Sequence, residues 1–242
     1  MSRLLELQDV VKRFGGLIAT NGLSFAVEEG ESLGLIGPNG AGKTTIFSLI
    51  MGELRQNAGT IRLGGEEISR LPTHARIRRG VARTYQVPRP FAEMDVASNI
   101  QVGLMPPSLW RMLVEPRDRA AEAALAESVG LPAEDLARTP SELSVGDLRK
   151  LELARTLATE PRIVLLDEVF AGLTVGEIAQ ISELIAERRA AGMTFVIVSH
   201  DLRSLEPLVD RVVAMAYGAV IAEGAFAEVT ADPAVRAAYL GT

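Results

Sequence analysis

Short apolar runs separated by turn residues dominate the first third of the chain and predict strands. Residues 4–11 and 22–27 are two such runs, and in the second the apolar side chains recur at every other position. Residues 58–63 form a third run, which two glycines end. A short basic helix over residues 72–79 is expected to lead into a further strand over residues 81–85.

The pattern changes to helical periodicity in the middle of the chain. Prolines interrupt regular structure near residues 88–90 and again at residues 106–107. The helices expected between and after these breaks cover residues 96–104, 117–129 and 145–159. We therefore predict a helical subdomain over residues 87–158, inserted into an α/β core that is formed by residues 1–86 and 159–242.

The last third of the chain alternates between strands and helices. Its expected strands cover residues 162–167, 193–199, 211–216 and 220–223. Its expected helices cover residues 175–190 and 232–239. Strands that alternate with helices over short connections predict an α/β protein whose sheet is mostly parallel and covered on both faces.

Composition narrows the class of protein further. The chain has 242 residues, of which 48% are hydrophobic, and this is enough for a sizeable core. It contains no cysteine, which excludes disulfides, thiolate zinc sites and a thiol nucleophile. A net charge of −6 argues against a general nucleic-acid surface. No apolar run approaches the ~20 residues of a membrane span, and early acidic residues argue against a secretory signal, so we expect a soluble chain.

Residues 37–45 read Gly-Pro-Asn-Gly-Ala-Gly-Lys-Thr-Thr and match the phosphate-binding pattern G-x-x-x-x-G-K-S/T. They lie between an apolar run at residues 31–36, which predicts a buried strand, and a helix expected over residues 44–54. Glycines let such a loop turn its backbone N–H groups toward phosphate oxygens. Lys43 is suited to reach the β- and γ-phosphates, and the Thr44 hydroxyl to bind Mg²⁺. The candidate nucleotide-binding residues of this loop are Gly37, Pro38, Asn39, Gly40, Ala41, Gly42, Lys43, Thr44 and Thr45.

Two acidic residues, Asp167 and Glu168, follow the apolar run that begins at residue 162. A buried strand here delivers them to the carboxyl edge of the sheet, next to the glycine loop. Asp167 is a candidate Mg²⁺ ligand, directly or through water. Glu168 lies just beyond the strand and is a candidate for polarising an attacking water molecule. The alternative is a pair of surface acids that follow a strand.

Three single residues complete the candidate site. Gln86 follows a predicted strand and can contact the metal ion or the water molecule, although a lone glutamine there is most often a surface residue. His200 follows the strand over residues 193–199, where it can hydrogen-bond the γ-phosphate and hold Glu168 and water in line, or else cap the strand or pack. Phe14 precedes two glycines and can stack on an adenine ring or pack as a core aromatic near a turn.

Residues 143–147 read Leu-Ser-Val-Gly-Asp and lead into one of the predicted helices. Ser144 is a favourable N-cap, and the free N–H groups of a helix start attract phosphate. From the residues alone, this stretch is either a nucleotide contact or simply a capped helix.

In order and spacing, and over the whole chain, these motifs resemble those of the ATP-binding subunits of ABC transporters. The corresponding motifs are the P-loop at residues 37–45, the Q-loop at Gln86, the signature at residues 143–147, the acidic strand end at Asp167 and Glu168, the D-loop near residues 171–174 and the switch His200. The resemblance implies an α/β P-loop NTPase fold of ABC type, with a mostly parallel sheet core, N-terminal antiparallel strands and an inserted helical subdomain. It also implies ATP and Mg²⁺ as cofactors, and ATP hydrolysis coupled to transmembrane transport.

Within this family the chain is most similar to the branched-chain amino acid uptake ATPases. The segments that carry this likeness are residues 12–19, 83–91, 166–174 and 238–241, together with a helical insertion around residues 106–119. Residues 71–76 and 78–80 resemble the lipopolysaccharide-export ATPases as well. Import of branched-chain or other hydrophobic amino acids is therefore expected, with lipid or lipopolysaccharide export as the alternative.

The resemblance implies partners too. Two ATPase subunits, either two copies or this chain and a related one, would pack head to tail, with Ser144 and Gly146 of each serving the ATP of the other. Two transmembrane permease subunits would hold the pair peripherally at the cytoplasmic face of the membrane, and a periplasmic-type binding protein would act indirectly. A groove around residues 85–91 would receive a permease helix, with Arg89 and Phe91 as contacts.

Two readings from other classes remain as alternatives. One is a soluble ABC ATPase of the DNA-repair or translation type, but those usually carry two nucleotide domains or a long coiled-coil insertion, and the acidic net charge disfavours DNA. No nucleic-acid partner is therefore expected. The other is a kinase-like P-loop enzyme, which would lack the signature and the switch histidine.

Three departures from the family pattern concern hydrolysis. Val145 and Asp147 stand where the usual signature has Gly and Gln, Val169 stands where Pro is frequent, and Thr174 stands where the D-loop has Asp or Asn. Asp147 adds negative charge near a γ-phosphate, which is expected to weaken nucleotide-driven closure unless Arg149 or Lys150 compensates. We expect ATP binding to be retained, and the departures leave the hydrolysis rate open.

Overall fold

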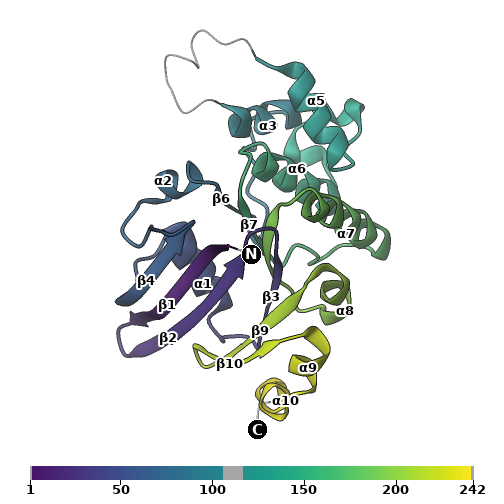
Figure 1. The fold of residues 1–242 in the computed structure, drawn as a ribbon. Coiled ribbons are helices and arrows are strands. Elements are labelled where there is room, and N and C mark those ends of the chain that lie inside the picture. The colour runs from purple at the N-terminus through teal and green to yellow at the C-terminus, as the bar shows by residue number, and fades with distance from the viewer. Residues whose placement is uncertain (1, 106–116, 241–242) are drawn as a thin grey trace.

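The structure, a computed structural model, describes residues 2–105 and 117–240 (Figure 1). The helical insertion expected around residues 106–119 lies largely outside these ranges, and so does Gly241 of the C-terminal segment. The described chain combines an antiparallel N-terminal sheet with a mostly parallel central sheet, which confirms the predicted fold class. Within the described residues, no helix is both long and apolar enough to cross a bilayer.

The N-terminal sheet has antiparallel strands in the order β2-β1-β4-β5. Its strands are β1 (Arg3–Phe14), β2 (Leu17–Glu28), β4 (Ala58–Leu63) and β5 (Glu66–Glu67). Strands β1 and β2 are longer than predicted, because a tight turn at Gly15 and Gly16 keeps them paired as far as Phe14 and Leu17. Gly15 has a φ of 57°, a value that residues with a side chain rarely adopt.

The central sheet has the strand order β10-β9-β3-β8-β7-β6, and its neighbours are parallel except for β9 and β10. Its strands are β3 (Ser32–Ile36), β6 (Val81–Arg83), β7 (Ile163–Asp167), β8 (Thr194–Val198), β9 (Arg211–Ala216) and β10 (Ala219–Gly224). Every residue of β3, β7 and β8 is buried, as expected for strands that are covered on both faces. The carboxyl ends of these three strands meet at one edge of the sheet, where ligands bind in such folds.

Helices α3, α5 and α6 gather at one end of the molecule, and α9 and α10 lie at the other (Figure 1). The described helices are α1 (Lys43–Met51), α2 (Thr73–Ile77), α3 (Val96–Leu104), α5 (Arg119–Ser128), α6 (Val145–Leu157), α7 (Val175–Ala190), α8 (Leu202–Leu205), α9 (Phe226–Ala231) and α10 (Pro233–Leu240). Short 3-10 turns cover Ala133–Ala137, Pro140–Glu142 and Glu206–Leu208.

Two differences from the predicted helices have local causes. Helix α1 ends at Met51, earlier than the predicted residue 54, because Gly52 takes the left-handed conformation with a φ of 76° and closes the helix. Helix α9 has no counterpart among the predicted elements. Its N-cap is Ala225, whose side chain makes no capping hydrogen bond, so the sequence carries no start signal there.

Alternate residues of β7 pack into two different cores. Ile163 and Leu165 face the core that contains α1 and the N-terminal sheet, whereas Val164 and Leu166 face the core that contains α6 and α7. A shift of one residue would exchange the two sets, so packing on both sides fixes the register of the strand. The residues that follow β7 are therefore held in one place and one direction.

Candidate functional site

The P-loop joins β3 to α1 and packs against the backbone of two other strands. Gly37 has a φ of 150°, and a Cβ atom there would lie 2.2 Å from the carbonyl oxygen of Met215 in β9. Gly42 has a φ of 104°, and its Cβ atom would lie 2.5 Å from the carbonyl oxygen of Ala19 in β2. Glycine is required at both positions, because any side chain would collide with backbone that cannot move away.

Lys43 is buried at the start of α1 and bonds to the loop that precedes it. Its Nζ atom donates to the carbonyl oxygens of Gly37 at 2.5 Å and of Pro38 at 3.1 Å. Burial lowers the pKa of Lys43, and the negative charges of Glu168 and Asp167 oppose that effect. The Lys43 side chain is therefore close enough to Asp167, which ends β7, and to Glu168, which follows it, for their charges to act on it.

The P-loop forms one wall of a cleft of about 340 Å³. The predicted site residues that line this cleft are Phe14, Asn39, Gly40, Ala41, Gly42, Lys43, Thr44, Thr45, Gln86, Glu168 and His200. The cleft thus joins the β1–β2 hairpin, the P-loop, the segment after β6 and the ends of β7 and β8. Phe14 is 43% exposed there, which contradicts its alternative placement as a core aromatic. Lys12 lies over the same ring, with Nζ 4.8 Å from the centroid.

Glu168 and His200 lie side by side at the ends of neighbouring parallel strands. The Nε2 atom of His200 is 3.1 Å from Oε1 of Glu168, and the His200 backbone N–H donates to Oε2 at 3.2 Å. Glu168 has a φ of 52°, which is uncommon for a residue with a side chain and often marks a functional site. The carboxylate is therefore held through both oxygens, in one orientation, beside Lys43 in the cleft.

Asp167 is buried beneath the cleft and pairs with Arg83, a residue that the sequence does not single out. Nη2 of Arg83 is 2.8 Å from Oδ2 of Asp167, and both side chains are almost fully buried. The described residues contain no cluster of three or more acidic residues or histidines that would hold a metal ion alone. A P-loop site needs few protein ligands, because phosphate oxygens and water supply the rest, so Thr44, Asp167 and Gln86 suit Mg²⁺ bound with a nucleotide.

Arg149 of α6 anchors the segment that carries Gln86. Its Nη1 atom donates to the Tyr85 carbonyl at 2.6 Å, and its Nη2 atom donates to the Gln86 carbonyl. The Tyr85 N–H donates to Oε1 of Glu152 at 2.8 Å. Burial raises the pKa of Glu152, although this N–H and Arg149 act in the opposite direction. Two residues of α6 thus set the position at which the chain leaves β6.

The signature residues begin α6, outside the lining of the cleft. Ser144 caps the helix: its Oγ atom accepts from the Asp147 N–H at 3.1 Å and donates to Oδ2 of Asp147 at 2.7 Å. Lys150 pairs with Asp147 at 3.3 Å, while Arg149 turns to the segment after β6. Of the two candidates for charge compensation at Asp147, Lys150 is therefore the one that contacts it.

Gly146 and Thr174 each lie against Glu177 in the first turn of α7. A Cβ atom on Gly146 would lie 1.7 Å from Oε1 of Glu177. Thr174 caps α7 together with Glu177, whose side chain accepts from the Thr174 N–H at 2.8 Å. Threonine is thus a competent helix cap at this position of the D-loop.

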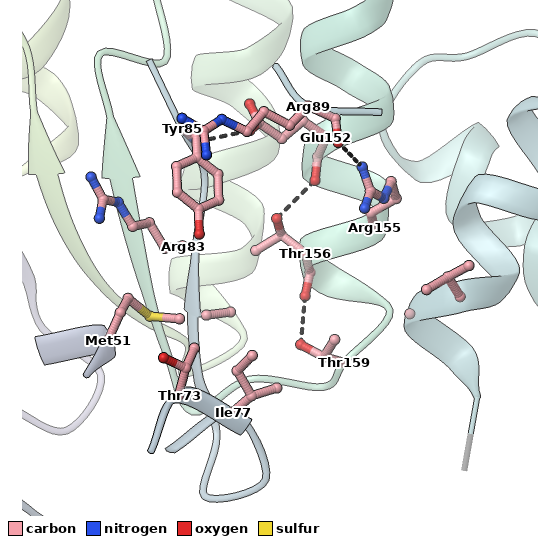
Figure 2. A pocket seen from close by; sticks show the side chains of 13 residues that line it. Met51, Thr73, Ile77, Arg83, Tyr85, Arg89, Glu152, Arg155, Thr156 and Thr159 are labelled. Atoms are coloured by element: carbon pink, nitrogen blue, oxygen red, sulfur yellow. Dashed lines mark hydrogen bonds between the residues drawn. The ribbon is translucent and has the colours of Figure 1, made fainter. Parts of the chain in front are cut away.

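A second cleft of about 360 Å³, which we call the lateral groove, lies between β6 and α6 (Figure 2). It is lined by Met51, Thr73, Ile77, Ala82, Arg83, Tyr85, Arg89, Val102, Gly103, Glu152, Arg155, Thr156 and Thr159. Arg89 lines it, whereas Phe91 is outside the lining and lies beneath Arg155, with the guanidinium carbon 4.7 Å from the ring centroid.

Tyr239 of α10 contacts the P-loop from a position 202 residues along the chain. Its hydroxyl accepts from the Gly37 N–H at 2.8 Å. Burial raises the pKa of Tyr239, and the charge of Glu168 adds to this effect. In the sequence, Tyr239 is singled out only as part of residues 238–241, a segment that resembles the branched-chain amino acid uptake ATPases. The sequence does not indicate which residue the Tyr239 side chain contacts.

Replacing Tyr239 with Phe is expected to lower the free energy of unfolding by about 1 kcal/mol, because the Gly37 N–H loses its partner. Urea unfolding measures the change. Tyr217→Phe is the matched control, since that side chain is 84% exposed and should give no loss. Equal unfolding midpoints for Tyr239→Phe and the wild type would contradict the role of this hydrogen bond.

The fold and the first cleft together define a nucleotide-binding protein of the P-loop class. The family profile described as ABC transporter matches residues 20–171, and the profile described as Branched-chain amino acid ATP-binding cassette transporter matches residues 219–242. The chain therefore belongs to the ATP-binding subunits of ABC transporters, which hydrolyse ATP to power transport.

Individual relatives agree with this assignment over their full length. The chain is 39% identical to the high-affinity branched-chain amino acid transport ATP-binding protein BraF of Pseudomonas aeruginosa, with 100% of this chain and 99% of that protein covered. It is 37% identical to the lipopolysaccharide export system ATP-binding protein LptB of Acidithiobacillus ferridurans, covering 100% and 98%. A solved structure, the ADP conformation of MJ1267, an ATP-binding cassette of an ABC transporter, superposes with a TM-score of 0.88 at 30% identity and covers 100% of both chains.

Proposed function

We propose that this chain powers the import of branched-chain or other hydrophobic amino acids. The observation that carries the proposal is the match of residues 219–242 to the profile of branched-chain amino acid cassettes, because this segment lies outside the general ABC match at residues 20–171. Full-length similarity to BraF supports it. The cargo itself would be selected by the membrane and capture subunits.

The first cleft would bind Mg-ATP through groups that line it, together with Asp167 beneath it. Lys43 and the P-loop N–H groups would hold the phosphates, and Phe14 would stack on the adenine. Thr44, Asp167 and Gln86 would hold Mg²⁺, which neutralises phosphate charge when bound. Glu168 would orient water for in-line attack, and His200, already in contact with Glu168, would hydrogen-bond the γ-phosphate.

Ser144 and Gly146 would serve the ATP of a second ATPase subunit. Both lie at the start of α6, away from the cleft of their own chain, so a nucleotide contact there needs a partner. The free N–H groups of the first helical turn favour a phosphate. Because Lys150 pairs with Asp147, the repulsion of a γ-phosphate by this carboxylate is expected to be smaller than the sequence alone suggests.

The lateral groove would receive a helix from one of two permease subunits, which would keep the pair of ATPases at the cytoplasmic face of the membrane. The groove separates residues 1–86 from the proposed helical subdomain of residues 87–158. Arg89 and Arg155 present guanidinium groups beside apolar side chains such as Ile77 and Val102, a combination that suits a helix with carbonyl or acidic groups at its end.

Arg89→Glu is the test of this docking site. The chain is coexpressed with permease and binding-protein subunits of a branched-chain amino acid importer with which it assembles, and uptake of labelled leucine is measured. We expect uptake to fall about tenfold or more, as for an interface arginine worth about 2 kcal/mol. ATP hydrolysis by the isolated chain should stay within about twofold of the wild type, since Arg89 lies outside the first cleft.

Arg62→Glu is the matched control, because Arg62 is exposed on β4 of the other sheet. Normal leucine uptake by Arg89→Glu would contradict the docking site. Failure of the wild-type complex to import any branched-chain or other hydrophobic amino acid would contradict the proposed cargo.

Lipid or lipopolysaccharide export is the second candidate, favoured by the 37% identity to LptB. If lipopolysaccharide-type lipid copurifies with the assembled complex and the complex does not take up leucine, the result would support export rather than import. A soluble ABC ATPase would instead copurify with nucleic acid, and the chain would not be found in the membrane fraction.

A further inference from the structure

Arg83 connects the first cleft to the lateral groove. It ends β6, one strand away from Asp167 at the end of β7, and its side chain is only 4% exposed. Its guanidinium contacts two carboxylates at once: Nη2 is 2.8 Å from Asp167, and Nη1 is 2.9 Å from Glu53. Nη1 also donates to Ser48 of α1 at 3.0 Å. One buried cation is thus shared between a candidate metal ligand and an acid near the end of α1.

The same guanidinium shapes the wall of the lateral groove. Its central carbon lies 4.9 Å from the centroid of the Tyr85 ring, and the Tyr85 hydroxyl donates to Glu53 at 2.6 Å. Arg89 lies over the same ring, also at 4.9 Å. Arg83, Tyr85 and Arg89 all line the groove (Figure 2). A movement of Arg83 would therefore displace Tyr85, either directly or through Glu53.

The Asp167 carboxylate cannot bind a divalent cation and the Arg83 guanidinium equally well at the same time. A divalent cation bound with nucleotide and the guanidinium of Arg83 would compete for the same carboxylate and repel each other across a buried space, where charges are poorly screened. Glu53 offers Arg83 a second carboxylate, so the guanidinium can lose one partner without becoming an unpaired buried charge.

We propose that Arg83 is a positioning residue that couples cation binding at Asp167 to the shape of the lateral groove. When Asp167 turns to Mg²⁺, Arg83 shifts its pairing to Glu53 and the Tyr85 ring moves with it. The inference rests on the proposed Mg-nucleotide site and on the groove as the permease contact. This route from the cation to the groove runs through the buried Arg83 in the interior of the sheet, and it is separate from the exposed Gln86.

The chain carries three tyrosines, at positions 85, 217 and 239, which makes 3-fluorotyrosine labelling and ¹⁹F NMR a direct test. Tyr85 reports on the groove, Tyr239 on the P-loop through Gly37, and the exposed Tyr217 is the internal reference. Tyrosine-to-phenylalanine variants assign the resonances. ADP is added with Mg²⁺ or with a chelator, so that no hydrolysis occurs.

In the wild type, Mg²⁺ with ADP should shift the Tyr85 resonance beyond the shift that ADP and chelator cause. In Arg83→Gln this extra shift should fall at least about threefold. The Mg²⁺ concentration for half-saturation should also fall about threefold or more, because Asp167 is released from its competitor. A purely structural role would weaken Mg²⁺ binding instead. The Tyr85 shift and the Mg²⁺ affinity of Arg83→Lys should lie between those of the wild type and Arg83→Gln. Arg79 is an exposed arginine in the turn before β6, and Arg79→Gln should match the wild type.

An unmoved Tyr85 resonance in the wild type, with Mg-ADP bound, would overturn the inference, and this result needs no variant. An equal Tyr85 response in Arg83→Gln, or weaker Mg²⁺ binding by it, would do the same. Absence of ADP binding by calorimetry, with Tyr239 unmoved, would instead overturn the proposed nucleotide site. If Arg83→Gln does not fold, the comparison is made with Arg83→Lys.

Discussion

Glu168→Gln is expected to reduce ATP turnover by about 10²- to 10⁴-fold, the usual contribution of a general base, while ATP binding is retained. Glutamine has nearly the same shape and can still accept the His200 N–H, but it cannot take a proton from water. The residue lies at the end of a buried strand whose register is fixed by two cores, so the substitution should leave the fold unchanged.

Phosphate release measures turnover, and gel filtration with ATP measures dimer formation, which the variant should show because bound ATP persists. Glu183→Gln is the control, since Glu183 is exposed on α7 and should behave as the wild type. Wild-type turnover in Glu168→Gln would remove Glu168 from the role of base. Loss of ATP binding would mean that this carboxylate holds the loop rather than the water.

Arg76→Met is expected to cost about 3–5 kcal/mol in the free energy of unfolding, because several buried carbonyls would lose their donor at once. Arg76 is 1% exposed, and its guanidinium lies at the end of α1. It donates to the carbonyls of Leu49 at 2.6 Å, Ile50 at 2.8 Å, Ser69 at 3.0 Å and Leu71 at 3.0 Å. Burial lowers the pKa of Arg76 to about 10, so the group is still charged at neutral pH.

Urea unfolding measures the loss, and the expected value is a large fraction of the 5–15 kcal/mol that stabilises a typical domain. Arg78→Met is the control, because Arg78 is exposed two residues further along. An unchanged midpoint for Arg76→Met would show that water replaces the guanidinium at the helix end. A loosened α1 should also weaken ATP binding, since Lys43 and Thr44 are in its first turn.

Local patterns predict much of this chain. Val96–Leu104 and Val175–Ala190 are helices with the predicted bounds, and Ala58–Leu63 is a strand with the predicted bounds. Their signals are contained in the segments themselves, as helical or alternating periodicity with turn residues at the ends. Helix α9 lacks such a signal at its start, and the extension of β1 and β2 depends on pairing with each other, so neither could be read from a single segment.

The candidate site divides in the same way. The sequence by itself determined the P-loop, the acid pair at the end of β7 and the histidine after β8, because each is a residue type at a fixed place relative to a strand end. Only the tertiary structure decided that Arg83 pairs with Asp167, that Tyr239 holds Gly37 and that Arg76 closes α1. These contacts join residues from separate elements, and no periodicity or spacing encodes them, since they exist only when packing brings the elements together.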